Sequence, residues 1–145
     1  MKQRVILIIL IAAFQSSAAQ STNDFLISGG MDLLKTDNTK LLGKAQIGFE
    51  VNYFLKRNFA VGAGADIWTG QKSSFVLGAR WYANEKIFFR FRGLIGANDA
   101  ALGMGYAKPI NRNWRFEAMG DLYFARPDFA LRAGVSYVIN YVTRK

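Results

Sequence analysis

The feature that most constrains the fold of this chain is an alternation of apolar residues with polar or small residues, which begins at Phe25 and continues almost to the C-terminus. A period of two is typical of β-strands that present two different faces. Each repeat is short and is followed by turn-forming or charged residues, which indicates separate strands. The pattern occurs in segments 25–34, 44–55, 59–68, 75–82, 87–95, 102–107, 113–124 and 128–141.

The connections between these eight segments alternate in length. Tight connections are expected at residues 56–58, 84–86 and 110–112, and longer ones at 35–40, 69–74 and 96–101. An even number of two-faced strands, with short turns on one side and longer loops on the other, is typical of barrels that cross an outer membrane. The sequence therefore predicts an all-β, eight-stranded antiparallel up-and-down transmembrane β-barrel.

The first residues resemble an export signal. Lys2 and Arg4 precede an apolar run of about ten residues that is too short to span a bilayer, and Ser17-Ala18-Ala19 forms a small-residue cleavage site. We expect a cleavable signal peptide at 1–19 and one barrel domain at 20–145. Removing two bases lowers the formal charge from +9 to +7, and export argues against a nucleic-acid partner.

The two faces of the predicted strands differ in charge. The apolar face carries no charged residue in the eight segments, whereas the polar face carries six acids and six bases. A balanced set of charges is expected where side chains share a narrow interior, because an unpaired buried charge is costly. Glycines on the same face leave room for arginine side chains. The predicted interior charge network is Asp32, Lys44, Glu50, Asp66, Arg80, Arg90, Arg92, Arg115, Glu117, Asp121, Asp128 and Arg132.

Aromatic residues on the apolar face gather near the tight-turn ends of the strands. This placement predicts an interfacial aromatic girdle of the kind found in membrane barrels. The alternative is that they are ordinary strand aromatics in a sandwich core. The predicted girdle residues are Tyr53, Phe59, Trp81, Phe89, Trp114 and Tyr141.

With these features, the mature chain resembles the small eight-stranded outer-membrane barrels of the OmpX and OmpA-transmembrane kind. The segment 103–109 (GMGYAKP) followed by 114–118 (WRFEA) is similar to a hairpin of uncharacterised Bacteroidota barrel proteins. The resemblance implies a Gram-negative outer-membrane location, contact with outer-membrane lipid, and the barrel-assembly machinery as a partner during biogenesis. The chain departs from the family in its last residues, since Val142 to Lys145 follow Tyr141 where an aromatic terminus is usual.

The chain contains no His and no Cys, which removes imidazole-assisted, thiol and imidazole-metal chemistry. Glu117 and Asp121 share a strand face, but four residues of strand place them about 13 Å apart, beyond the usual hydrolytic carboxylate pair. We therefore expect no catalytic, cofactor or metal site. Four bases near the longer loops are candidates for contact with lipopolysaccharide, with simple solvation as the alternative: Lys35, Lys40, Lys72 and Arg126.

Three hypotheses for function follow from the sequence. The leading hypothesis is a non-enzymatic outer-membrane barrel with a structural or membrane-organising role. The second is an adhesin-like protein or a subunit of an envelope complex, although short loops give little area for a partner. The third is an exported soluble barrel that carries a lipid-like ligand, which would require the apolar face inside and the charges outside.

Overall fold

The computed structural model describes residues 22–35, 46–68, 73–125 and 127–140, with the backbone alone for residues 34 and 35. Eight β-strands account for most of this length. No helix in the described ranges is long and apolar enough to cross a membrane. The strands are β1 (Phe25–Lys35), β2 (Gln46–Lys56), β3 (Phe59–Trp68), β4 (Ser74–Tyr82), β5 (Ile87–Ile95), β6 (Asp99–Pro109), β7 (Trp114–Tyr123) and β8 (Phe129–Ile139).

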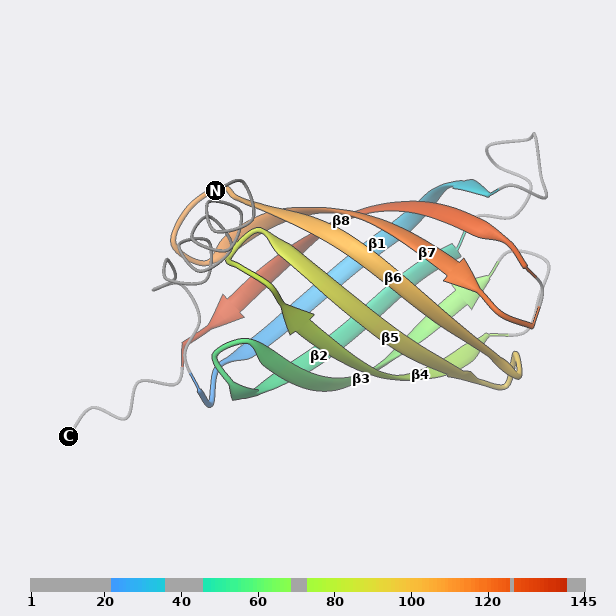
Figure 1. Cartoon of the computed structure of the whole chain (residues 1–145), viewed down its shortest axis with the longest axis horizontal. Coiled ribbons are helices and arrows are strands. Elements are labelled where there is room, and N and C mark those ends of the chain that lie inside the picture. Colours follow the sequence, from blue (N-terminus) through green and yellow to red (C-terminus); the bar gives the residue numbers. More distant parts are fainter. Residues whose placement is uncertain (1–21, 36–45, 69–72, 126, 141–145) are drawn as a thin grey trace, which may run out of the picture.

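The strands form one closed antiparallel barrel in which each strand pairs with its neighbours in sequence (Figure 1). The barrel closes where β1 pairs with β8, from Phe25 opposite Ile139 to Lys35 opposite Ala130. One register shift interrupts that pairing between Asp32 and Leu34. Closure leaves no unpaired sheet edge, which is the requirement that a barrel in lipid must meet. The predicted eight-stranded antiparallel barrel is thereby confirmed.

The two ends of the barrel differ in their connections. The end that we call the turn end carries the tight connections 57–58, 83–86 and 110–113, together with the start of β1 and the end of β8 (Figure 1). The opposite end, the loop end, carries the connections that follow β1, β3, β5 and β7. The connections at 36–45 and 69–72 lie outside the described residues.

One predicted loop is wrong. The longer connection expected at 96–101 is only three residues, 96–98, because β6 begins at Asp99 and reaches Pro109. Gly96 and Asn98 adopt positive φ angles of 106° and 51°, which these residue types tolerate and which make a tight reversal possible. The Asp99 carboxylate accepts hydrogen bonds from the backbone N–H of Ala100 (2.7 Å) and Ala125 (2.8 Å).

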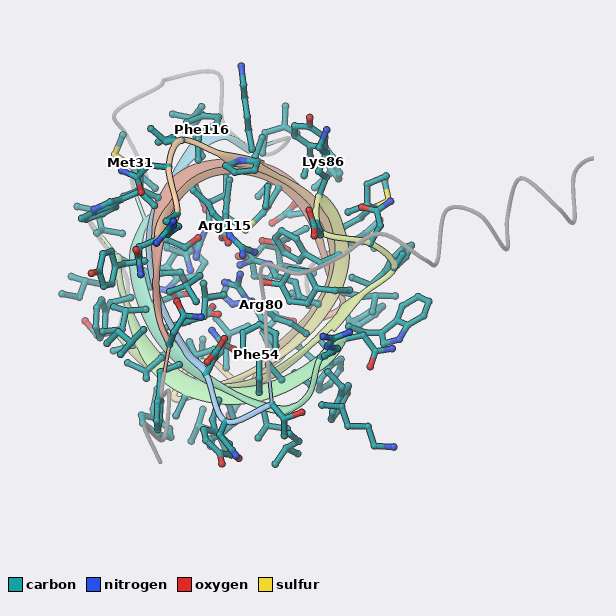
Figure 2. All side chains as sticks on the ribbon, turned by 90° about the vertical axis from the view of Figure 1, so that its left-hand side faces the viewer. Met31, Phe54, Arg80, Lys86, Arg115 and Phe116 are labelled. Carbon is teal, nitrogen blue, oxygen red and sulfur yellow. The ribbon has the colours of Figure 1, made fainter. Side chains whose placement is uncertain are left out.

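The alternation in sequence becomes a separation of inside from outside. Figure 2 shows Phe54, Arg80 and Arg115 within the ring of strands, whereas Met31 and Phe116 project away from it. Arg80 is 2% exposed and Phe116 is 43% exposed. The apolar face therefore points outward, and the face that carries the charges points inward, as the charge balance predicted.

The interior is layered along the barrel axis. On β5, the inward residues run from Phe88 at the turn end through Arg90 and Arg92 to Leu94 at the loop end, and all four are buried. Apolar residues thus cover the charged middle on both sides. The turn-end cluster, which we call the apolar plug, consists of Leu26, Phe54, Ala60, Tyr82, Phe88, Ala107, Met119 and Val138. At the loop end, Leu94, Ala101, Tyr123 and Ala130 pack with Trp68.

Candidate functional site

The centre of the barrel interior is built around the carboxylate of Glu50, on β2. Three arginine side chains reach it from β4 and β5. The Glu50 carboxylate lies 2.7 Å from Arg92 Nε, 3.4 Å from Arg80 Nη2 and 3.8 Å from Arg90 Nη1. One acid therefore bridges three cations, and its own side chain is almost fully buried.

Each of those arginines also contacts a second acid. Arg80 donates from Nη1 to both carboxylate oxygens of Glu117, at 3.1 Å each, and so links β4 to β7. Arg90 donates from Nε to Asp121 Oδ1 at 2.8 Å, and its Nη2 also contacts this carboxylate. A guanidinium group suits this role because its planar fork can satisfy two carboxylate oxygens at once.

A second acid, Asp66 on β3, joins this cluster to the β1–β8 seam. Its Oδ2 accepts a hydrogen bond from Arg92 Nη2 at 2.5 Å, and its Oδ1 lies 3.6 Å from Arg132 Nη1. Arg132 in turn donates from Nε to Asp32 Oδ1 at 2.6 Å across the closure of the barrel. The ion pairs therefore connect seven of the eight strands, all except β6, and they include strand pairs that are not neighbours in the sheet.

Neutral polar residues extend the network beyond the predicted charges. Ser28 Oγ accepts a hydrogen bond from Arg80 Nη2 at 2.9 Å. Gln46 donates its side-chain N–H to Asp66, and the Tyr123 hydroxyl donates to Gln46 Oε1 at 3.4 Å. These residues also occupy inward positions of their strands. The alternation in sequence already placed them on the inward face. The predicted network omitted them because it contained only charged residues.

Interior glycines form sockets for side chains of the neighbouring strand. Gly103 lies directly opposite Asp121, and Gly48 lies directly opposite Asp66. A β-carbon at either glycine would overlap the facing carboxylate. Gly64 lies opposite Glu50, and a β-carbon there would overlap the backbone oxygen of Phe49 and crowd Glu50 itself. The sequence indicated that glycines make room, and the structure shows that the room is specific to particular side chains.

The other predicted network residues lie in different places. Arg115 is buried at the turn-end part of β7 and is opposite Ser136 in the sheet register. Asp128 lies half-buried one residue before β8 begins, where its backbone carbonyl accepts a hydrogen bond from Tyr123 N at 2.9 Å. It therefore belongs to the end of the barrel, because β8 starts only at Phe129. Lys44 lies outside the described residues.

The aromatic residues predicted as a girdle pair around the outside of the turn end. Trp81 stacks on Phe89 with ring centroids 5.7 Å apart, and Phe59 lies opposite Trp81 in the register. Tyr53 packs on Phe25 at 5.0 Å, and its hydroxyl donates to Asn23 Oδ1 at 2.6 Å.

The register adds outward aromatics that sequence reasoning missed. Trp114 packs edge-on against Tyr137 with ring centroids 5.0 Å apart. Phe25 and Tyr137 lie directly opposite Tyr53 and Trp114, and Tyr106, opposite Ile87, is a further exposed aromatic residue near the turn end. We call the predicted girdle together with these three residues the outward aromatic band. Tyr141 lies outside the described residues.

The four bases predicted to contact lipopolysaccharide cannot be placed with their side chains. Lys35 is the last residue of β1, and only its backbone is described. Lys40, Lys72 and Arg126 lie outside the described residues.

The network fills the space that it encloses. The cavity between Glu50, Arg80, Arg90 and Arg132 has a volume of only about 10 Å³. That is room for roughly one water molecule. Among the described residues, no three His, Cys, Asp or Glu side chains are grouped so that they could hold a metal ion. What this arrangement can do chemically is hold opposite charges together and join strands across the barrel.

Comparison with known proteins supports the fold. No protein-family profile matches the chain, and no curated protein matches it in sequence. Among solved structures, a de novo designed transmembrane β-barrel covers 83% of this chain and 98% of its own length at 11% identity and a TM-score of 0.66. The solution structure of the designed barrel TMB2.3 covers 86% of this chain and 99% of its own length at 20% identity and a TM-score of 0.58.

The outer-membrane protein OprG from Pseudomonas aeruginosa also matches, at 11% identity and a TM-score of 0.44, over 83% of this chain and 98% of that protein. At these identities the likeness concerns the fold. The chain itself is an eight-stranded closed antiparallel barrel, and its likeness in fold is to the two designed transmembrane barrels.

Proposed function

We propose that this chain is an integral outer-membrane β-barrel with a non-enzymatic, structural or membrane-organising role. The observation that carries the proposal is the outward face. Apolar side chains on four of the strands are each about half exposed and belong to one outward apolar surface: Ile47 and Phe49 on β2, Leu77 on β4, Phe91 on β5 and Leu102 on β6. Exposed apolar patches on water-soluble monomers rarely exceed a few hundred Å², whereas lipid requires such a belt.

The distribution of charge supports the same proposal. Lys56 and Lys108 are the charged side chains at outward positions of the described strands, and both lie at the turn end. A Lys or Arg at the middle of a bilayer costs about 2 to 4 kcal/mol in a membrane barrel, while one near the interface costs much less. A barrel that carried a ligand in water would need the reverse arrangement, with apolar residues inside and charges outside.

A structural role fits the filled interior. Five arginines and five acids are buried on the inner faces of the described strands, and the apolar plug lies at the turn end of the same interior: Arg80, Arg90, Arg92, Arg115 and Arg132, with Asp32, Glu50, Asp66, Glu117 and Asp121. Side chains fill the interior of an eight-stranded barrel of this kind. We therefore propose a barrel that strengthens or organises the membrane and does not serve as an open channel.

The proposal is tested by fractionating expressing Gram-negative cells and comparing boiled with unboiled samples on a denaturing gel. We expect the protein in the outer-membrane fraction, with an apparent mass that changes on boiling because the closed barrel resists detergent. The matched control is the same chain started at Gln20, which should remain in the cell interior without that band. A soluble full-length protein, or a membrane protein with no change on boiling, would contradict the proposal.

A further inference from the structure

The turn end of the barrel presents a ring of basic side chains. Lys56 is the last residue of β2 and Arg57 lies in the β2–β3 turn. Lys86 lies in the β4–β5 turn, Lys108 lies near the end of β6, and Arg112 lies in the β6–β7 turn. All five side chains are exposed. The three turns join β2 to β3, β4 to β5 and β6 to β7. Because the strands follow one another around the closed barrel, the bases are spread around its circumference.

The acids at this end do not balance the ring. Glu85, in the β4–β5 turn, is half-buried, and Asp24, just before β1, is fully buried. Asp24 accepts a hydrogen bond from the side-chain amide of Asn140 at 2.9 Å, which holds it at the β1–β8 seam. The described surface of the turn end is therefore strongly positive.

Two members of the ring, Lys56 and Lys108, lie beside outward aromatic residues. Lys56 is directly opposite Phe59 in the β2–β3 register. Lys108 lies two residues beyond Tyr106 on the same outward face, and it is opposite Phe116. Aromatic bands of this kind lie at the headgroup level of a bilayer, and long basic side chains beside them extend toward the phosphates.

Two of the turns have the same locked geometry. In the β4–β5 turn, Asn84 Oδ1 accepts from the backbone N–H of Lys86 and of Ile87, at 2.8 Å each. In the β6–β7 turn, Asn111 Oδ1 accepts from Asn113 N at 3.0 Å and Trp114 N at 2.9 Å. The asparagine oxygens occupy backbone donors in both turns, and the exposed side chains of Lys86 and Arg112 provide charged donors toward a ligand.

We propose that this ring, Lys56, Arg57, Lys86, Lys108 and Arg112, recruits anionic phospholipid headgroups from the leaflet that adjoins the tight turns. The inference rests on the proposed membrane location. The group that the bases would bind is the phosphodiester of a lipid headgroup. The bases are spread around the barrel at headgroup depth, so each would contact a separate lipid molecule. Attraction of this type depends on charge, so high salt should weaken it.

The test uses the mature barrel folded into vesicles of equal parts phosphatidylcholine and phosphatidylglycerol, followed by native mass spectrometry of the lipids retained. We expect the wild type to retain phosphatidylglycerol in several-fold excess over phosphatidylcholine, and 1 M salt to reduce that excess. In the ring variant K56Q/R57Q/K86Q/K108Q/R112Q, the ratio should fall to about one. The matched control removes five positive charges around the longer connections: Lys35, Lys40, Lys44, Lys72 and Arg126, each to Gln.

The control barrel should keep most of the wild-type preference. Equal losses in both variants would show attraction by net charge alone and would overturn the ring as a site. No preference in a wild-type barrel that is folded, as judged by its boiling-dependent band, would overturn this inference and leave the proposed function standing. A chain that forms no folded barrel in vesicles would overturn both. Binding of sedimented peptidoglycan without any lipid preference would assign the ring to the cell wall instead.

Discussion

The carboxylate of Asp121 lies over Gly103 on the neighbouring strand, in the space that a β-carbon at position 103 would occupy. The same carboxylate accepts a hydrogen bond from Arg90 Nε at 2.8 Å. The absence of a side chain at 103 therefore sets the position of an interior ion pair. A glycine and a charge on adjacent strands act as one packing unit.

The first prediction concerns that socket. Gly103→Ala should destabilise the barrel by about 1 to 3 kcal/mol, because the added methyl group displaces Asp121 from Arg90 or forces the strands apart. The control is Gly93→Ala, whose new β-carbon would meet only Leu77 O at an ordinary 3.8 Å. Urea unfolding of both variants in detergent micelles measures the difference. Equal stability of the two variants would contradict the socket.

The second prediction concerns the hub of the ion pairs. Glu50→Gln removes the charge that Arg80, Arg90 and Arg92 share, and we expect a loss of about 3 to 5 kcal/mol, as for breaking a buried pair. Glu85→Gln, in the β4–β5 turn where the side chain is only half-buried, should change the free energy of unfolding by no more than about 1 kcal/mol. Equilibrium unfolding compares them. A Glu50→Gln barrel as stable as the wild type would show that the network does not depend on this carboxylate.

The third prediction tests which solvent the outward face meets. Phe91→Arg, at the middle of β5, should cost about 2 to 4 kcal/mol in a bilayer, whereas Ile87→Arg, at the turn end of the same strand, should cost about 0 to 1 kcal/mol. Unfolding from lipid vesicles measures both values. If the two substitutions prove equally harmless, the outward face does not contact lipid.

The fourth prediction concerns the apolar plug. A β-carbon at Gly105 would overlap the ring of Phe88, which lies directly opposite it. Gly105→Ala and Phe88→Ala should each destabilise the barrel, the latter by about 3 to 5 kcal/mol because it leaves a cavity. The double variant should be more stable than the sum of the two single losses predicts, because the methyl group at position 105 then occupies space that the Phe88 ring vacated. Additive losses in a double-mutant cycle would contradict this contact.

Much of the architecture could be predicted because it depends on local rules. The alternation around Phe129 to Ile139 identified β8 as a two-faced strand, and the charges on its inner positions indicated that its apolar face points outward. The connection at 96–98 could not be predicted in this way. The glycines and alanines of 96–105 carry little alternation, so the early start of β6 at Asp99 depends on pairing with Leu94 across the sheet.

The interior illustrates a second limit of sequence reasoning. Phe54, Phe88 and Val138 occupy inward positions that alternation assigned to the polar face, yet they form part of the apolar plug. Their role depends on their height along the barrel axis, which sequence spacing within one strand does not reveal. Strand stagger brings residues from separate strands to the same level, and that level decides whether they pack with rings or with charges.

By itself, the sequence determined the number of strands, their two faces and the tight turns, because each depends on residues close together in the chain. Tertiary structure decided which charges pair. Arg80 meets Glu117 from β7, and Arg132 on β8 meets Asp66 on β3, although neither pair lies on adjacent strands. Only closure of the sheet into a narrow barrel brings these side chains within reach, because strands far apart around the wall then face each other across one interior.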